Sequence, residues 1–218
     1  MSNIVTPTGD PPADPSKTES RAFHHGNLRR ALLEAALTAS DIEGISLRQI
    51  AARVGVTPAA AYRHFENREA LLDEVARIGF DRLAMRFARA FDIFRVPADA
   101  PEARSRLIRL AEAYLQFADE ETALWRLLFG THGARYRATG RPNGRPDTYS
   151  YLTVALDGLY HTGTIVRATD ARDEFFAWSA IHGAAALRNG HTSSALAPVA
   201  QLAQEIALRV IRSVQSPP

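Results

Sequence analysis

Residues 46–72 read SLRQIAARVGVTPAAAYRHFENREALL, and this stretch decides the fold. Its apolar residues recur at helical spacing on both sides of a Gly-Val-Thr turn, which predicts one helix over about residues 47–54 and another over about residues 58–64. Two helices joined by a short turn that contains glycine form a helix-turn-helix. Such a pair can place its second helix in the major groove of DNA, which is about 12 Å wide. It also occurs in ordinary helical bundles, so the spacing alone leaves both interpretations open.

The ends of both helices have their own signals. Ser46 and Gln49 have the spacing of a capping box, in which each side chain accepts a hydrogen bond from the backbone N–H of the other residue. Gly55 is placed to end the first helix in a left-handed turn. Thr57 and Pro58 suit the N-cap and the first position of the second helix. These residues predict where both helices begin.

One face of the second helix has the side chains that a DNA groove would accept. On a helical wheel, Ala61 and Phe65 form a buried ridge, and Tyr62 lies on the flank, where its hydroxyl can reach a phosphate. The opposite face has two methyl groups between two hydrogen-bonding side chains, namely Ala59, Ala60, Arg63 and His64. Alanine lets the backbone approach the bases and can contact a thymine methyl group.

Further DNA contacts are expected from the ends of the helices. Ser46 and Thr57 stand at helix N-termini, where unpaired N–H groups attract anions. Arg48, in the first turn of the first helix, can reach a guanine edge or a phosphate. Arg68 opens the next helix, where a cation opposes the helix dipole, so a nearby phosphate would explain its position.

Positive charge is concentrated around these helices. The net charge of the chain is only +2, but residues 21–68 hold seven arginines against four acidic residues. Arginine stays protonated and binds phosphate through a two-pronged fork. This local excess is the electrostatic pattern expected of a nucleic-acid-binding segment.

The composition excludes several classes of protein. Hydrophobic residues make up 46% of the 218 residues and charged residues 23%, which excludes a fibrous or wholly disordered chain. No run approaches the roughly 18 apolar residues of a membrane-spanning helix, and no secretory signal is visible. The absence of cysteine excludes disulfides and suits the cytosol. We therefore expect a cytoplasmic protein with no membrane partner.

Helical spacing continues through the rest of the chain, with no alternating β pattern. Asn27 suits the N-cap of the helix that precedes the helix-turn-helix, and Asn67 caps a fourth, longer helix running towards Phe94. After a break at residues 96–101, helices are expected over about 101–118, 122–129, 147–168, 171–188 and 197–213, and a loop over 130–146. The expected fold class is therefore all-α, with about nine helices.

The motifs closely resemble the N-terminal domain of TetR-family transcriptional repressors. They are SLRQIA at 46–51, VGVT at 54–57 and AYRHFENREALL at 61–72, and HHGNLR at 24–29 resembles the lead-in of one subgroup. Farther along, the Trp, His and Gly of WSAIHG at 178–183 resemble the Trp-His-Gly (WHG) signature of a C-terminal domain of that family.

The resemblance implies a three-helix DNA-binding head, a linking fourth helix and a larger helical body that dimerises and often holds a small effector. The expected division is a disordered leader over 1–20, the helix-turn-helix domain over 21–68 and the body over 69–218. The implied function is that of a homodimeric repressor. It would bind a pseudo-palindromic operator in double-stranded DNA and respond to an unknown small apolar or amphipathic effector.

Two sets of residues in the body are candidates for these roles. An apolar set could line an effector pocket, although core packing is the commoner role for each: Trp125, Phe129, Tyr149, Leu152, Leu156, Phe176 and Trp178. The family's usual dimer helices have stripes that could instead pack inside one subunit: Phe175, His182, Gly183, Ala186, Leu202, Ile206 and Val210. His182 also fits a buried histidine bonded to a neighbour.

No motif points to catalysis or to a metal. The sequence lacks a nucleophile motif, a His-Glu-x-x-His and a Gly-rich phosphate loop. His24 and His25 are adjacent and have no third ligand at suitable spacing, so neither a metal nor another cofactor is expected. An interaction module that has lost DNA binding is the alternative, and the intact set of Arg48, Tyr62 and Arg68 argues against it.

Overall fold

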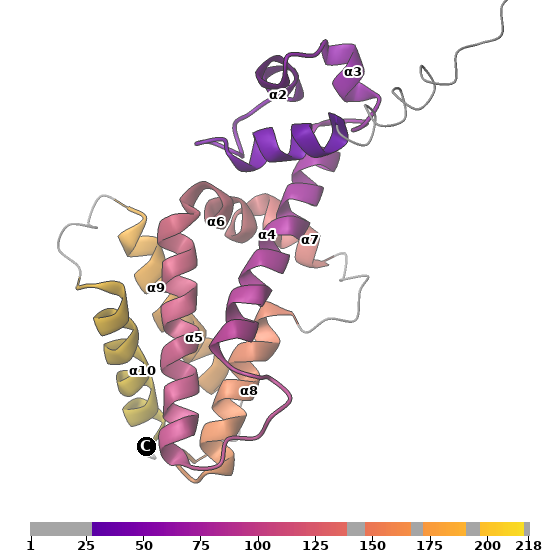
Figure 1. Cartoon of the computed structure of the whole chain (residues 1–218). Helices are drawn as coiled ribbons and strands as arrows, with labels where there is room; N and C mark the ends of the chain where they lie inside the picture. Colours follow the sequence, from indigo (N-terminus) through magenta and orange to yellow (C-terminus); the bar gives the residue numbers. More distant parts are fainter. Residues whose placement is uncertain (1–27, 139–146, 167–171, 191–196, 216–218) are drawn as a thin grey trace, which may run out of the picture.

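The computed structural model describes residues 28–138, 147–166, 172–190 and 197–215. In these ranges all regular secondary structure is α-helical, so the expected fold class is confirmed. A small helical head stands above a larger helical body, and one long helix runs from the head into the body (Figure 1). The leader predicted over residues 1–20 lies outside the described residues.

The head consists of a helix over residues 28–37, α2 (Leu47–Val54) and α3 (Pro58–Tyr62). The predicted capping box is present. The backbone N–H of Gln49 donates to Ser46 Oγ at 3.2 Å, and the backbone N–H of Ser46 donates to Gln49 Oε1 at 2.8 Å. Both bonds satisfy donors that the first turn of α2 leaves unpaired.

The turn between α2 and α3 also follows its sequence signals. Gly55 has a φ of 77°, a left-handed conformation that favours glycine. Thr57 Oγ1 accepts a hydrogen bond from the backbone N–H of Ala60 at 3.3 Å and caps α3. The helix ends at Tyr62, two residues before its predicted end, and the next two residues form a turn. The short helix α3 therefore begins where its N-cap residue, Thr57, predicts.

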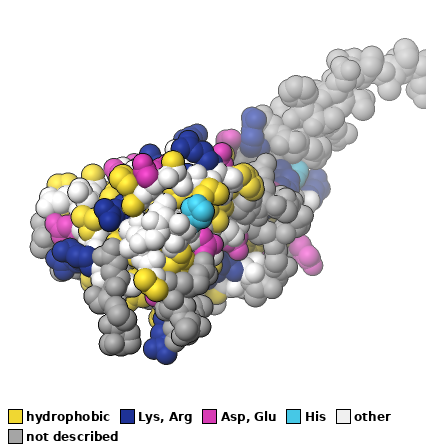
Figure 2. Space-filling view, turned by 90° about the horizontal axis from the view of Figure 1, so that it is seen from below, with side chains coloured by type: hydrophobic (Ala, Val, Ile, Leu, Met, Phe, Trp, Pro, Cys, Tyr) yellow, Lys and Arg dark blue, Asp and Glu magenta, His cyan; other side chains and the backbone are white. Residues whose placement is uncertain are grey.

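The body is formed by α4 (Arg68–Ala90), α5 (Ala100–Glu120), α6 (Thr122–Phe129), α7 (Thr131–Ala138), α8 (Thr148–His161), α9 (Arg172–Arg188) and α10 (Val199–Gln215). Helix α5 is central and packs against α4, α8, α9 and α10. Seen from the end farthest from the head, the body surface mixes apolar and charged side chains (Figure 2). Within the described ranges, no helix has the length and hydropathy needed to span a membrane.

The predicted loop over residues 130–146 is wrong in its first half, because residues 131–138 form α7. The ring of Tyr136 stacks on Phe80 of α4, with centroids 5.7 Å apart. The guanidinium of Arg137 donates to the carbonyl of Leu128 at 2.7 Å. These contacts with other helices stabilise a segment whose local sequence does not favour a helix.

Two helices end earlier than predicted. α8 ends at His161 and not near residue 168, because Gly163 turns the chain with a φ of 65°. α4 ends at Ala90 and not near Phe94, because the backbone of the next residue is extended. Both helices stop where the backbone leaves the helical conformation, although their apolar spacing continues.

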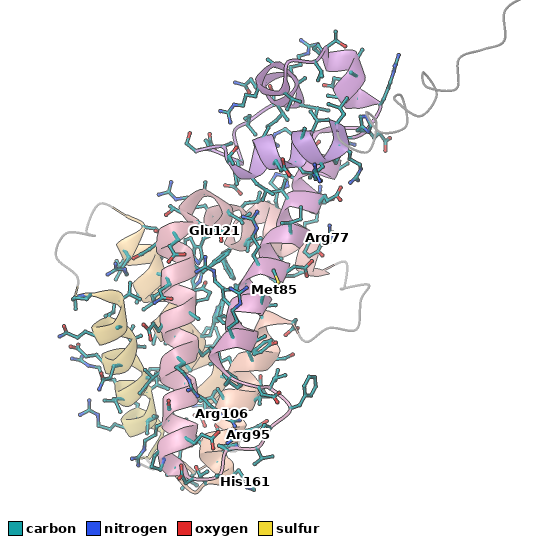
Figure 3. All side chains as sticks on the ribbon, in the orientation of Figure 1. Arg77, Met85, Arg95, Arg106, Glu121 and His161 are labelled. Atoms are coloured by element: carbon teal, nitrogen blue, oxygen red, sulfur yellow. The ribbon has the colours of Figure 1, made fainter. Side chains whose placement is uncertain are left out.

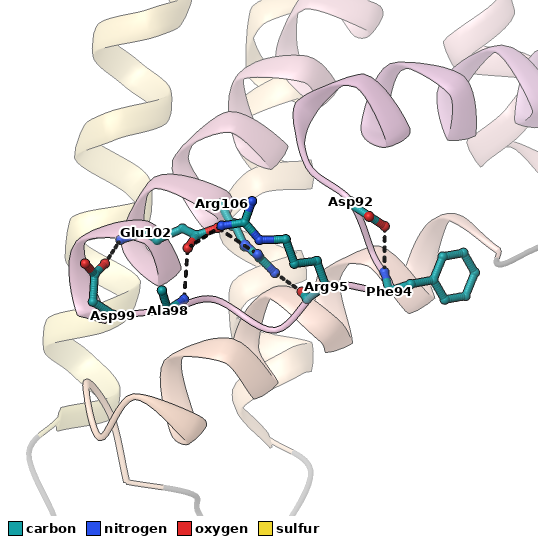
Figure 4. A network of polar contacts seen from close by, with 7 residues as sticks. All are labelled: Asp92, Phe94, Arg95, Ala98, Asp99, Glu102 and Arg106. Carbon is teal, nitrogen blue, oxygen red and sulfur yellow. Dashed lines mark hydrogen bonds and ion pairs between the residues drawn. The ribbon is translucent and has the colours of Figure 1, made fainter.

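The connection between α4 and α5 is fixed by a buried arginine. Arg106 is 1% exposed, and it donates to Glu102 Oε1 at 2.8 Å and to the carbonyl of Arg95 (Figure 4). Glu102 also accepts the backbone N–H of Ala98 at 2.9 Å. The bond from Ala98 and the bond from Arg106 lower the pKa of Glu102 to about 2, from an ordinary value of 4.5. Glu102 thus joins α5 to the preceding loop as a carboxylate.

We expect Glu102→Gln to destabilise the protein at pH 7 and to have little effect near pH 2. Because folding lowers the pKa of this carboxyl, its contribution is complete above pH 4.5 and is lost as the pH falls through about 2. Urea unfolding of both proteins at several pH values measures this. The exposed Glu205→Gln serves as the control and should cost little at any pH. A deficit of Glu102→Gln that stays constant from pH 7 to pH 2 would contradict the prediction.

Candidate nucleic-acid interface

Helix α3 has one side in the core of the head and the other open to solvent. Ala61 is 0% exposed and Phe65 is 2% exposed, so both lie on the buried side that the helical wheel predicts. The other side lies outside the core, with Ala59 and Arg63 exposed and Ala60 and His64 half-buried. The face expected to meet DNA is therefore accessible.

The helix pair also has unpaired positive charge. Arg48, Arg53 and Arg63 are exposed, and none has a hydrogen-bond or ion-pair partner among the residues that the structure describes. Tyr62 is 47% exposed and Thr57 is exposed. Arg53 lies in the last turn of α2 and was not in the predicted set, whose members from this helix all lie at its N-terminus. An arginine without a protein partner is free to bind phosphate through its fork.

Two of the predicted contact residues have roles inside the protein. Ser46 is half-buried, and its hydroxyl donates to Gln49 Oε1 at 2.8 Å. Arg68 Nε donates to the carbonyl of Ile45 at 2.9 Å, and Arg68 Nη1 lies 3.6 Å from Glu69. These contacts explain the cation at the start of α4 without a phosphate. Arg68 connects α4 to the residue before the α2 cap.

The first helix fixes the head onto α4. Arg29 Nη1 donates to Glu74 Oε1 at 2.7 Å, and the Arg29 guanidinium lies 4.8 Å from the ring centroid of Phe65. Sequence reasoning missed this pair, because 45 residues separate its two members. The orientation of the α3 face relative to the body therefore depends on contacts along the N-terminal half of α4.

The residues predicted to line an effector pocket lie partly in the core and partly at the surface. Neighbouring rings of one aromatic cluster have centroids 5.6 Å apart: Trp125, Phe129 and Trp178. Two leucines are buried and two aromatic side chains are each 46% exposed: Leu152, Leu156, Tyr149 and Phe176. Core packing accounts for the buried members, and contact with an effector stays a prediction.

His182 joins this cluster from α9. His182 Nδ1 lies 2.7 Å from the Tyr114 hydroxyl, which also accepts a hydrogen bond from Trp125 Nε1 at 3.0 Å. The imidazole stacks on Trp178 with an interplanar angle of 18°. Burial, reinforced by the charge of Arg137, lowers the pKa of His182. These contacts match the buried histidine bonded to a neighbour that the sequence also allowed, and a place for His182 in the dimer interface stays a prediction.

The other predicted dimer residues differ in exposure. On α9, Phe175 is 71% exposed and Ala186 is exposed. A methyl group added to Gly183 would meet nothing within 4 Å. Two residues of α10 are half-buried against the core, Leu202 and Ile206. Val210 is 2% exposed and packs in the core of its own chain, the alternative that the sequence left open for these stripes.

Comparison with protein families gives one match. The family described as "Bacterial regulatory proteins, tetR family" matches residues 32–75, which include α2, α3 and the first turns of α4. No curated protein matched the sequence. The matched segment contains the outward face of α3 and its unpaired arginines.

Solved structures resemble the chain over both head and body. A protein with unknown function from Rhodococcus sp. RHA1 is 28% identical, with a TM-score of 0.67 over 89% of this chain and 98% of that one. A putative TetR-family transcriptional regulator from Rhodococcus sp. is 22% identical, with a TM-score of 0.60 over 87% and 100%. PfmR, a TetR family transcriptional regulator from Thermus thermophilus, is 19% identical, with a TM-score of 0.60 over 84% and 97%.

Proposed function

We propose that this chain is a DNA-binding transcriptional regulator of the TetR family and that it acts as a homodimeric repressor. Two heads would bind the half-sites of a pseudo-palindromic operator in the cytoplasm. A small apolar or amphipathic effector in the body would favour a conformation in which the heads no longer match the half-sites. The observation that carries the proposal is the solvent-exposed face of α3, where small side chains accompany an unpaired arginine.

Fluorescence anisotropy with DNA from the flanks of its own gene tests the DNA-binding part. We expect sequence-selective binding whose affinity falls by about 1,000-fold or more between 50 and 200 mM salt, because arginine–phosphate contacts release counterions. A scrambled duplex of the same length is the control. Equal affinity for both duplexes, or no binding, would favour an interaction module that has lost DNA recognition.

We propose that α9 supplies the centre of the dimer interface. Its open face has three large apolar side chains, Phe175, Phe176 and Leu187, which are 71%, 46% and 59% exposed. Such a patch on one helix is typical of an interface core. Gly183 on the same face leaves room for a close crossing of two helices. Two-fold symmetry would then separate the two α3 helices by about 34 Å, one turn of DNA, or somewhat more.

We expect Phe175→Glu to raise the dimer dissociation constant by at least about 100-fold, because it places a charge in the apolar centre of the interface. Sedimentation velocity over a concentration series measures this. Phe94→Glu is the matched control, since Phe94 is 86% exposed on the α4–α5 connection, away from α9. If both variants have the same dimer dissociation constant as the unmodified protein, the interface does not lie on this face of α9.

We further propose that the body belongs to the WHG subgroup of C-terminal domains. Trp178 and His182 are one helical turn apart on α9, and their rings stack with centroids 5.3 Å apart. The glycine that follows His182 lies on the open side of the helix. Trp178 and His182 thus belong to the aromatic core, whereas Gly183 belongs to the proposed dimer face.

A further inference from the structure

A solvent-open groove of about 680 Å³ lies between α4 and α5, separate from the aromatic cluster of the body. Its lining residues recur at helical spacing on both helices: Arg82, Met85, Arg86, Arg89 and Ala90 on α4, and Arg109, Glu112, Ala113, Gln116 and Glu120 on α5, with Glu121 at the end of α5. In Figure 3, Met85 lies on α4 beside α5, and Glu121 lies nearer the head. The volume is in the range of small-molecule sites.

Ion pairs close the end of the groove that lies nearer the head. Arg82 Nη1 lies 2.7 Å from Glu121, and Arg86 Nη2 lies 2.8 Å from Glu120 and 3.2 Å from Glu121. These arginines and glutamates neutralise one another. A ligand with a charged group therefore has little to gain at this end.

The other end of the groove has unpaired positive charge. Arg89 and Arg109 both line it, and neither has a hydrogen-bond or ion-pair partner within the described part of the chain. Glu112 is the remaining acidic residue, and it accepts a hydrogen bond from Gln116 at 3.2 Å. Two guanidinium groups without a partner in the described part of the chain therefore line this end together with one carboxylate, which already has a partner.

The surface of the groove between its two ends is partly apolar, with Gln116 among the polar residues that also line it. Met85 is 50% exposed, and Ala90 and Ala113 contribute methyl groups from the two helices. The lining residues of α4 run from Arg82 to Ala90, which is about 12 Å along the helix axis. An exposed thioether beside small side chains suits a flexible apolar chain.

We infer that this groove binds an anionic amphipathic small molecule, a carboxylate with an unbranched apolar chain of about ten carbons. Its head group is held by Arg89 and Arg109, because guanidinium groups bind carboxylates through paired hydrogen bonds. Its chain runs from there over Met85 and Ala113, while Ala90 lies beside the head group. Neither half of the ligand would suffice alone, since the cations and the apolar surface occupy adjacent parts of one groove.

The groove is also placed to act on the head, an aspect that rests on the proposed function. α4 extends from the head into the body and forms one wall of the groove. A ligand between α4 and α5 changes their separation, and α4 transmits this change to α3. Bound decanoate is therefore expected to lower operator affinity by 5- to 150-fold, the usual range of coupling between two sites.

Methionine NMR gives a direct test, because Met1 and Met85 are the only methionines. With 13C-methyl methionine, decanoate is expected to shift the Met85 resonance saturably below 1 mM and to leave Met1 unchanged. 1-Decanol and inorganic phosphate each represent half of the ligand and should bind at least tenfold more weakly. Met85→Leu identifies the resonance, and all titrations use the full chain.

Variants test whether the shift of the Met85 resonance depends on Arg89 and Arg109. Arg89→Gln combined with Arg109→Gln should weaken decanoate binding at least tenfold. Arg104→Gln should leave it unchanged, because Arg104 is exposed on α5 and lies outside the groove. A Met85 resonance that decanoate does not move would overturn the proposal. So would unchanged binding to the double variant, or phosphate binding as tight as that of decanoate.

Fluorescence anisotropy of operator DNA, measured with and without decanoate, then separates the proposed repressor function from the proposed ligand site. If decanoate shifts the Met85 resonance but leaves operator affinity unchanged, the groove is a binding site without a regulatory role. If the protein binds no operator at all, the proposed repressor function fails, while the NMR titration still decides the site. A Met85 shift together with a 5- to 150-fold loss of operator affinity supports both steps.

Discussion

Ala59→Glu is expected to lower the affinity for operator DNA by about 100-fold while the head remains folded. Ala59 is exposed in the first turn of α3, two residues after the Thr57 cap. A carboxylate at this position would face the phosphates and base edges that the proposal places against α3. The expected loss corresponds to about 1.4 kcal/mol in each half-site of a dimer, a modest repulsion between two like charges at close range.

Helix stability would change in the opposite direction, which makes this substitution informative. α3 has no acidic residue in its first turn, and a glutamate there interacts favourably with the helix dipole, by about 0.3–1 kcal/mol. Ala88→Glu, exposed on α4, introduces the same charge away from α3 and should change affinity less than about threefold. Anisotropy at fixed salt, with thermal unfolding in parallel, compares the two. Equal losses would mean that total charge and not position decides binding.

The helix-turn-helix could be predicted from sequence because its signals are local. The Ser46–Gln49 pair, the left-handed glycine and the Thr57 cap each act within four residues of the helix end that they define. The burial of Ala61 followed from helical geometry alone, because only one side of so short a helix can face the core. The sequence therefore predicted both the boundaries of α2 and the buried side of α3.

Contacts between distant residues were not visible in the same way. Arg68 seemed to need a phosphate because a cation in the first turn of a helix opposes the helix dipole, yet it bonds the carbonyl of Ile45, 23 positions away. α7 was missed for a similar reason, since the stacking of Tyr136 on Phe80 joins two helices. Local patterns cannot reveal a stabilising partner that only the fold brings close.

The candidate sites of the body depend on exposure, which periodicity does not determine. Phe175 and Val210 both occupied apolar stripes, but one is 71% exposed and the other 2%. Similarly, Arg89 and Arg109 are 20 positions apart in the sequence, and only the packing of α4 on α5 places them in one groove. An apolar stripe predicts that a residue is covered, but it does not say whether its own chain or a partner covers it.

Gly133→Ala is expected to lower the free energy of unfolding by about 3 kcal/mol, because the backbone of α7 is pressed against α6. A Cβ atom on Gly133 would lie 1.7 Å from the carbonyl oxygen of Leu128. That oxygen belongs to the backbone and cannot rotate away, so α7 must shift. For a chain of 218 residues the expected fall in Tm is roughly 6–12 °C at equal protein concentration.

Helix propensity predicts the opposite sign, so this substitution separates packing from propensity. An alanine in an exposed helix is about 1 kcal/mol more favourable than a glycine, and Ala134→Gly at the exposed neighbouring position should cost about that amount. If Gly133→Ala raised Tm, the close contact with Leu128 would not exist. If it lowers Tm as expected, operator affinity should fall as well. Arg135 of α7 bonds Asp73 of α4 at 2.8 Å, so a displaced α7 loosens the helix that holds the head.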